Sequence, residues 1–274
     1  MWGRRTAMIG VAAAAGLLPL ALATPSQAAE NATVSVLHGV PGLTVDVYAN
    51  GEELIPDFEP GTLTDPLKLP AGSYDLTVFP AGEGPDGDPA IEANDVEVPA
   101  GANATVVAHL DANGDPMLSL FANDTSSVPA GKARLTVRHV AAAPAVDVRA
   151  DEQPVFEGLE NPDEVSAEVA AGSVSADVVL AGTSDVAIGP ADLDLAEGTN
   201  TIVYAWGSAE DANLELATQT VDGLHSAPKG VPAGSAGLAG DADGMPMWLL
   251  LATGAALVGA AGAGSRVVQV RARR

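Results

Sequence analysis

Residues 33–47 read Thr-Val-Ser-Val-Leu-His-Gly-Val-Pro-Gly-Leu-Thr-Val-Asp-Val, and residues 134–148 read Arg-Leu-Thr-Val-Arg-His-Val-Ala-Ala-Ala-Pro-Ala-Val-Asp-Val. In each stretch valine or leucine alternates with other residues, a His follows, and a Val-Asp-Val triplet comes after a short turn. An apolar period of two is typical of a strand with one buried face. Because the pattern occurs twice with one spacing, it predicts a duplicated β unit.

Further pairs of matching segments extend this duplication toward the C-terminal end of each copy. They recur in the same order at an offset of about 100 residues. The pairs are Ala71-Gly-Ser73 with Ala171-Gly-Ser173, Gly101 to Val107 with Gly198 to Tyr204, and Leu118-Ser-Leu120 with Leu214-Glu-Leu216. Matching segments in one order predict two tandem domains, at residues 29–124 and 133–223, joined by a linker at residues 125–132.

Turn residues separate the alternating segments within each copy. Asn50-Gly51 and Asn113-Gly114 are dipeptides that suit two-residue hairpins. About seven short strands per copy, with little sign of helix, predict an all-β fold of two tandem antiparallel β-sandwiches. The sandwich is of immunoglobulin-like or transthyretin-like kind. The Cys…Trp…Cys hallmark of immunoglobulins is missing, so the strand order stays open.

Both ends of the chain carry the marks of export and anchoring. Residues 1–28 combine Arg4 and Arg5, an uncharged Ala- and Leu-rich stretch and a small-residue cleavage pattern, which together predict a signal peptide. Residues 244–265 are 22 residues without a charge, enough to cross a bilayer as a helix. A Pro/Gly/Ser-rich stalk at residues 224–243 precedes this predicted transmembrane helix, and a basic cytoplasmic tail at residues 266–274 follows it. The prediction is a single-pass membrane protein whose β-domains are extracellular.

The charge of the predicted exterior is strongly negative. All 36 acidic residues lie between Glu30 and Asp243, against six basic ones there, which leaves a formal charge of −30. Such a surface repels nucleic acid and anionic lipid, so the expected partners are the membrane, through the C-terminal helix, and an unknown envelope or extracellular ligand. Cysteine is absent, so an exported chain of this kind must be held together by core burial.

The opening motif of each copy resembles a known family. Val36-Leu-His38 with Val45-Asp-Val-Tyr48, and Val137-Arg-His139 with Pro144-Ala-Val-Asp-Val148, are similar to the start of the exported domain of unknown function 4397. Pro70-Ala-Gly-Ser-Tyr74 is similar to a later strand of that family, whereas the second copy has Val174 in place of the tyrosine. The resemblance implies two secreted β-domains and gives no catalytic residues.

Two His–Asp pairs occupy equivalent positions in the copies. His38 precedes Asp46, and His139 precedes Asp147, by eight residues each. A repeated pair of this kind could be a ligand set or a catalytic dyad. We favour a structural hydrogen bond that ties the first turn to the second strand, because no nucleophile accompanies either pair.

The segment from Asp111 to Asp115 is the candidate metal site. Asp111, Asn113 and Asp115 have the alternating oxygen ligands of a calcium loop, but the closing Glu is missing, since Ala122 stands there. The alternative is a hairpin turn at Asn113-Gly114, which we favour. Weak calcium binding by this loop stays a hypothesis, and no other cofactor is expected.

The sequence contains no recognisable catalytic motif. It lacks Gly-x-Ser-x-Gly, Ser-x-x-Lys, a phosphate loop and a dinucleotide fingerprint. Ile202, Tyr204 and Trp206 share one face of a predicted strand, where core packing is favoured over stacking on a sugar. We therefore expect a non-enzymatic surface module for adhesion, ligand binding or envelope structure. The alternatives are a calcium-dependent binding module and an envelope hydrolase or accessory subunit.

Overall fold

The computed structural model describes residues 30–226, which contain 16 β-strands and one short 3₁₀ segment, η1 (Gly84–Asp86). The strands of the first repeat are β1 (Ala32–Gly39), β2 (Val45–Ala49), β3 (Glu52–Phe58), β4 (Leu67–Leu69), β5 (Gly72–Pro80), β6 (Ile91–Val98), β7 (Asn103–Leu110) and β8 (Pro116–Ala122). The strands of the second repeat are β9 (Lys132–Ala142), β10 (Val146–Ala150), β11 (Gln153–Leu159), β12 (Glu164–Ala170), β13 (Gly172–Leu180), β14 (Val186–Leu195), β15 (Asn200–Ser208) and β16 (Glu215–Val221).

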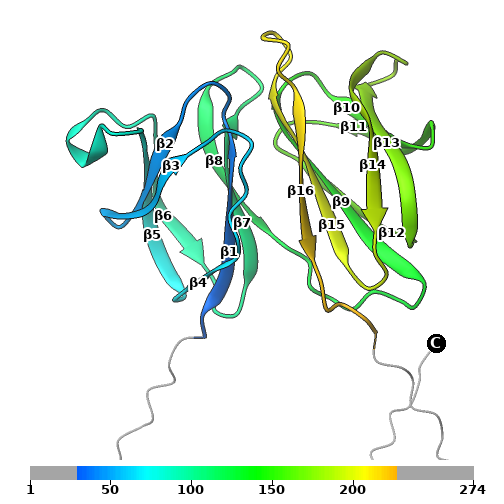
Figure 1. Cartoon of the computed structure of the whole chain (residues 1–274), viewed down its shortest axis with the longest axis horizontal. Coiled ribbons are helices and arrows are strands. Elements are labelled where there is room, and N and C mark those ends of the chain that lie inside the picture. The colour runs from blue at the N-terminus through cyan, green and yellow to red at the C-terminus, as the bar shows by residue number, and fades with distance from the viewer. Residues whose placement is uncertain (1–29, 227–274) are drawn as a thin grey trace, which may run out of the picture. The chain divides into compact units, whose positions relative to one another are not determined.

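Each repeat is a sandwich of two four-stranded sheets (Figure 1). The first has the orders β4-β1-β7-β8 and β3-β2-β5-β6, and the second has the orders β12-β9-β15-β16 and β11-β10-β13-β14. Every strand of the second repeat is the eighth after its counterpart, so the duplication and the all-β fold are confirmed. In an immunoglobulin domain the first strand pairs with the second, whereas here β1 lies between β4 and β7.

The expectation of a purely antiparallel sandwich is wrong for one strand pair in each repeat. β1 pairs with β7 in parallel, and β9 pairs with β15 in parallel. The chain leaves β1 for the opposite sheet and returns to pair with β1 only at β7, which gives the long crossover that a parallel pair requires. Side-chain alternation is the same in both strand directions, so the sequence pattern could not reveal this.

The alternating valines form the core of each sandwich, as the sequence predicts. Val34, Val36, Val45 and Val47 are buried in the first core, and their counterparts fill the second. The predicted turn at Asn50-Gly51 joins β2 to β3 with positive φ at both residues, 52° and 79°, as a two-residue hairpin requires.

The two repeats share a third apolar cluster, which the sequence did not predict. Its buried members come from both repeats: Leu37, Val107, Phe121, Val140, Ile202, Tyr204 and Trp206. They occupy the second face of the sheets β4-β1-β7-β8 and β12-β9-β15-β16, so all nine residues of β15 are buried. The two sandwiches therefore pack on each other through these two sheets.

The predicted linker is part of the folded unit. Val128 is only 1% exposed, its N–H donates to the Leu224 carbonyl (2.7 Å), and its own carbonyl accepts from Ser226 N–H (3.1 Å). Strand β9 begins at Lys132, within the expected linker 125–132. Residues 224–226, which we assigned to the stalk, are bound to this segment. The described fold thus runs on to Ser226.

The other predicted segments lie outside the described residues. They are the signal peptide (1–28), the rest of the stalk (227–243), the transmembrane helix (244–265) and the basic tail (266–274). Within residues 30–226, no helix is long and apolar enough to cross a membrane.

Candidate functional site

The two repeated histidines each close the turn that follows the first strand of their repeat. His38 Nε2 donates to the Leu43 carbonyl (2.7 Å), and His139 Nε2 donates to the Pro144 carbonyl (3.0 Å). In both rings Nδ1 faces a backbone N–H two residues further on, at 3.4 Å. Each side chain is 1% exposed. Both ring nitrogens are therefore committed to the backbone in the neutral form of the ring.

The two repeated aspartates bind elsewhere. Asp46 accepts hydrogen bonds from the N–H groups of Asp57 (2.8 Å) and Gly82 (2.9 Å). Asp147 accepts the matching pair from Gly158 (2.7 Å) and Gly182 (2.8 Å), and these bonds lower its pKa, with Gly182 contributing most. Each carboxylate thus joins its strand to the neighbouring strand, β3 or β11, and to the turn after β5 or β13.

The structure does not bring His and Asp together as a dyad. Each His binds the turn before Val-Asp-Val, and each Asp binds the neighbouring strand 11 residues further along the chain and a turn about 35 residues further along. The repeated His and Asp therefore make separate contacts with the backbone. Both imidazoles are 1% exposed and bonded to backbone groups.

Three buried histidines predict a loss of stability in mild acid. Burial lowers the pKa of His38, His109 and His139. Since the unfolded chain then binds more protons, the free energy of unfolding falls as the pH drops through about 6.5, the ordinary pKa of His. We expect the melting temperature to decrease between pH 7 and pH 5.5, above the range in which most carboxylates titrate. The double variant H38Q/H139Q should flatten this dependence, because a neutral amide can still donate to the same carbonyls.

His225 supplies the control for this prediction, because it is the one His of the chain that is exposed. The variant H225Q should leave the slope of melting temperature against pH unchanged. A slope that is the same in H38Q/H139Q as in the wild type would contradict the assignment to the buried rings.

The loop from Asp111 to Asp115 is a hairpin turn between β7 and β8. One carboxylate oxygen of Asp111 accepts the N–H groups of Asn113 (2.8 Å) and Asp115 (2.9 Å), and these backbone bonds lower the pKa of Asp111. The favoured hairpin interpretation fits this geometry, because Gly114 takes a φ of 90° at the turn. Within residues 30–226, no three His, Cys, Asp or Glu side chains are grouped as metal ligands. Calcium binding by Asp111, Asn113 and Asp115 stays a prediction.

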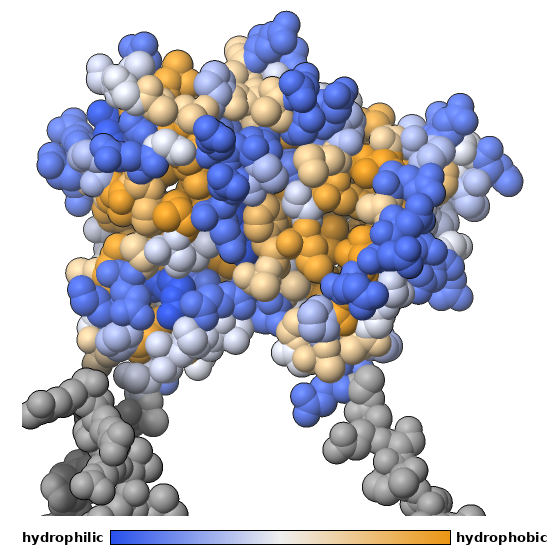
Figure 2. All heavy atoms as spheres, turned by 180° about the vertical axis from the view of Figure 1, so that it is seen from behind, coloured by the Kyte–Doolittle hydropathy of each residue, from blue (hydrophilic) through white to orange (hydrophobic). Residues whose placement is uncertain are grey.

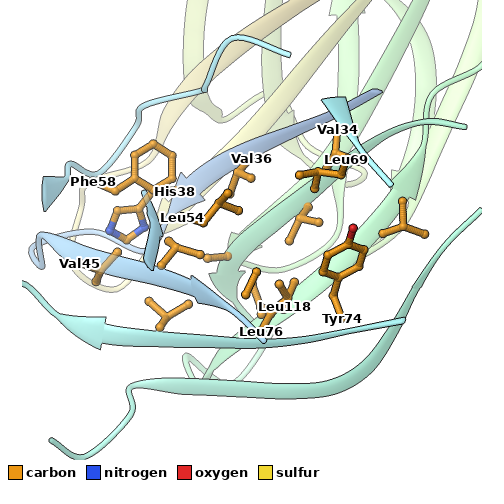
Figure 3. A pocket seen from close by; sticks show the side chains of 16 residues that line it. Val34, Val36, His38, Val45, Leu54, Phe58, Leu69, Tyr74, Leu76 and Leu118 are labelled. Atoms are coloured by element: carbon orange, nitrogen blue, oxygen red, sulfur yellow. The ribbon is translucent and has the colours of Figure 1, made fainter. Parts of the chain in front are cut away.

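The interior of the first sandwich contains a small apolar cavity of about 30 Å³ (Figure 3). His38 lies at one end of it, stacked on Phe58 with ring centroids 5.6 Å apart, and Tyr74 lies at the other end. A cavity of this size is about that of one water molecule and offers no polar partners to one. It is a small packing defect of the core.

A buried polar network joins the repeats, and sequence reasoning missed it. Gln219 is its centre: its side-chain oxygen accepts from Thr105 Oγ1 (2.9 Å) and from the Tyr204 hydroxyl (2.6 Å), and its amide donates to Ser35 Oγ (3.2 Å). Arg138 Nη1 donates to the Tyr204 hydroxyl at 2.8 Å. Thr105 and Ser35 belong to the first repeat and the other three to the second. Burial raises the pKa of Tyr204, so its hydroxyl stays neutral and can donate.

Trp206 lies in this shared interface rather than on an open surface. It is 5% exposed and lies against two glycines of the first repeat: its Cβ is next to Gly39, and its ring covers Gly61. A Cβ atom at Gly61 would lie 2.8 Å from Trp206 Cζ2, so only glycine leaves room for the ring. The expectation that Trp206 packs in a core agrees with this position, but the core is the one between the repeats.

Comparison with protein-family models finds a match, which covers the first repeat. The model described as Domain of unknown function (DUF4397) matches residues 32–149, which include β1 to β8 and the first strands of the second repeat. A search of curated proteins finds no match to the chain. The match covers one copy of the domain, whereas the sequence resemblance implies two and the strand order repeats twice. Residues 32–149 of this chain are similar to the DUF4397 family.

Proposed function

We propose that this chain is a non-enzymatic cell-surface protein. Residues 244–265 hold it in the cell membrane, and its two β-sandwiches lie outside the cell, where they serve adhesion, ligand binding or envelope structure. The strand order β4-β1-β7-β8 opposite β3-β2-β5-β6 also favours a sandwich of transthyretin-like kind over an immunoglobulin-like one.

The observation that carries this proposal is the position of the two ends of the folded unit. Glu30 and Ser226 lie at the same end of the sandwiches, while the hairpin loops at residues 111–115 and 209–214 lie at the opposite end (Figure 1). Along the sequence, 17 residues separate Ser226 from the apolar segment 244–265, which supports attachment through the part of the chain that follows the folded unit.

The buried histidines support the non-enzymatic part of the proposal. In the hydrolase alternative, His38 or His139 would have to reach a substrate. Both are 1% exposed and bound to backbone through the turns that they close. Substrate access would require unfolding of the turn.

A test of anchoring compares two truncations of the full-length chain in its native host. Ending the chain after Asp243 removes the apolar segment, and we expect the product in the medium. Ending it after Ser265 removes only the basic tail and should leave the product with the membrane fraction, where protease added to intact cells digests it. The proposal fails if the full-length chain stays in the soluble cytoplasm, or if both truncations give the same fractionation.

A further inference from the structure

One edge strand of the described sheets differs from all the others in lacking charge. Four open sheets have eight edge strands, and seven of these carry at least one charged residue: β3, β4, β6, β11, β12, β14 and β16. Strand β8 reads Pro-Met-Leu-Ser-Leu-Phe-Ala and carries none. It also pairs with β7 over seven residues without a register shift. Charges and bulges normally protect edges against pairing with another chain, and β8 has neither.

The unpaired backbone groups of β8 follow from its register. At the two ends of the ladder, Asn123 N–H donates to the Asn103 carbonyl and Asp111 N–H to the Asp115 carbonyl, both at 2.8 Å. Bonded pairs alternate along an antiparallel ladder, so Met117, Ser119 and Phe121 also bond to β7. The N–H and C=O groups of Leu118 and Leu120 therefore point away from β7, along the free edge.

A groove with apolar walls adjoins this edge. It lies between β8 and β6, has a volume of about 320 Å³, and is lined by Val96, Val106, Leu118 and Leu120, with Asp95 and Glu97 on the β6 side. Leu120 is 39% exposed and is one of three large apolar side chains exposed on the described residues. Figure 2 shows that apolar side chains lie among strongly hydrophilic ones on the face turned away in Figure 1.

The charges on the groove identify the class of occupant. A purely apolar segment would cover the side chains of Leu118 and Leu120. It would leave the carboxylates of Asp95 and Glu97 beside it without partners. A second copy of this chain would bring a surface with the same acidic excess, and like charges repel. Lysine or arginine side chains on an added strand would instead meet the two carboxylates.

We propose that the free edge of β8 and the adjoining groove bind an extended segment of another protein that carries both apolar and cationic side chains. The segment adds a strand to the sheet β4-β1-β7-β8 by bonding to the backbone of Leu118 and Leu120. Its apolar side chains enter the groove, and its lysines or arginines lie beside Asp95 and Glu97. This inference deepens the proposed function by naming the chemistry of a ligand. It rests on the proposed function only for the location of that ligand outside the cell.

The test uses the full-length chain in a mild detergent and a labelled, terminally blocked peptide, Thr-Val-Thr-Lys-Thr-Val-Thr-Lys. Its valines and lysines share one face of a strand. Fluorescence anisotropy at about 0.15 M salt measures binding, and hydrogen exchange with mass spectrometry locates it. We expect binding together with slower exchange in the peptides that contain Leu118 and Leu120. The same peptide with Glu in place of Lys should not bind.

Matched variants decide whether the site is the one proposed. Leu120→Lys gives β8 a charge that repels the lysines of the peptide and removes the apolar wall of the groove, and we expect it to weaken binding by about tenfold or more. Val186→Lys makes the same kind of change at another exposed apolar position, 50% exposed on β14, and should leave binding unchanged. The double variant Asp95→Asn/Glu97→Gln should weaken binding and reduce its salt dependence. Circular dichroism confirms that each variant is folded.

Several results would overturn the inference. They are absence of peptide binding, equal binding by Leu120→Lys and wild type, and protection confined to other strands. A concentration-dependent dimer that Leu120→Lys abolishes would show that a second copy occupies the edge, and would also overturn it. None of these results bears on membrane anchoring, which the truncations test separately.

Discussion

Replacing Trp206 by alanine is expected to lower the free energy of unfolding by about 3–5 kcal/mol and to let the two repeats unfold separately. Trp206 is 5% exposed and its indole covers Gly61, so removal of the ring leaves a cavity between the repeats. Neighbouring side chains cannot fill this space easily, because one of its walls is the backbone of a glycine. The loss therefore affects the contact between the sandwiches more than either sandwich core.

Urea denaturation of the full-length chain, followed by far-ultraviolet circular dichroism, measures this effect. Wild type should give one transition over residues 30–226, and Trp206→Ala should give a lower midpoint and a broader or two-step transition. Trp206→Phe keeps much of the buried area and should fall between the two. Val186→Ala, at an exposed position, should change stability by no more than about 0.5 kcal/mol. A Trp206→Ala protein that melts like wild type would show that the repeats do not depend on this contact.

Gly61→Ala should disturb the same contact with Trp206, because Gly61 is the residue of the first repeat that the indole ring covers. The new Cβ would lie 2.8 Å from the Trp206 ring, and Gly61 has a φ of +77°, which disfavours alanine. We therefore expect a destabilised chain whose two halves unfold separately, although the substitution removes no side chain. Gly51→Ala is the control: its φ is +79° but nothing lies within 4 Å of the new Cβ, so it should reproduce only the backbone strain.

The sequence predicted the strands and the duplication because both depend on local pattern. Valines at alternate positions, such as Val34 and Val36, needed only a period of two to be assigned to a core. The direction of β7 relative to β1 could not be predicted in the same way. The direction depends on which sheet the chain enters after each turn. The alternation of apolar and polar residues is the same in either sheet, so it cannot predict this.

The sequence does contain a pattern from which the packing of the repeats on each other could be predicted. Ile202 to Trp206 is an unbroken apolar run, and Val106 and Val107 are adjacent apolar residues that face opposite sides of one strand. Such runs indicate strands that are buried on both faces. The polar residues of the same interface were less visible. A threonine or an arginine at an alternate strand position has the same pattern as a solvent-exposed face.

The sequence indicated which residues of the candidate site correspond to each other but not their partners. His38 and His139 make the same contacts in the two copies, and so do Asp46 and Asp147. Their partners could not be inferred, since Asp46 binds backbone groups 11 and 36 residues away, whose positions depend on the whole sheet. The polar pair is therefore repeated because each copy of the fold needs the same backbone contacts, and its repetition does not by itself indicate a catalytic site.

Arg138→Ala should lower the free energy of unfolding by about 2–4 kcal/mol, because the guanidinium makes several contacts that no small side chain replaces. Arg138 is 1% exposed, donates to Tyr204 and pairs with Glu164 at 2.8 Å. Its guanidinium carbon also lies 4.5 Å from the centroid of the Phe121 ring, in the first repeat. The Glu164 side chain is 41% exposed, so water can solvate its carboxylate in the variant. The loss of stability is therefore smaller than that expected when a fully buried ion pair is broken.

A double-mutant cycle with Tyr204→Phe isolates the contact that belongs to the interface network. Since Arg138 donates to the Tyr204 hydroxyl, the two losses should overlap, with a coupling of about 0.5–3 kcal/mol. Arg138→Lys should recover less than half of the loss, because one ammonium group cannot reach Tyr204, Glu164 and the Phe121 ring together. Arg149→Ala is the matched control: Arg149 pairs with Asp177 inside the second repeat, so its loss should leave the contact between the repeats intact and the two repeats should still unfold together. Additive losses for Arg138 and Tyr204, or separated transitions in Arg149→Ala, would contradict the assignment of Arg138 to the contact between the repeats.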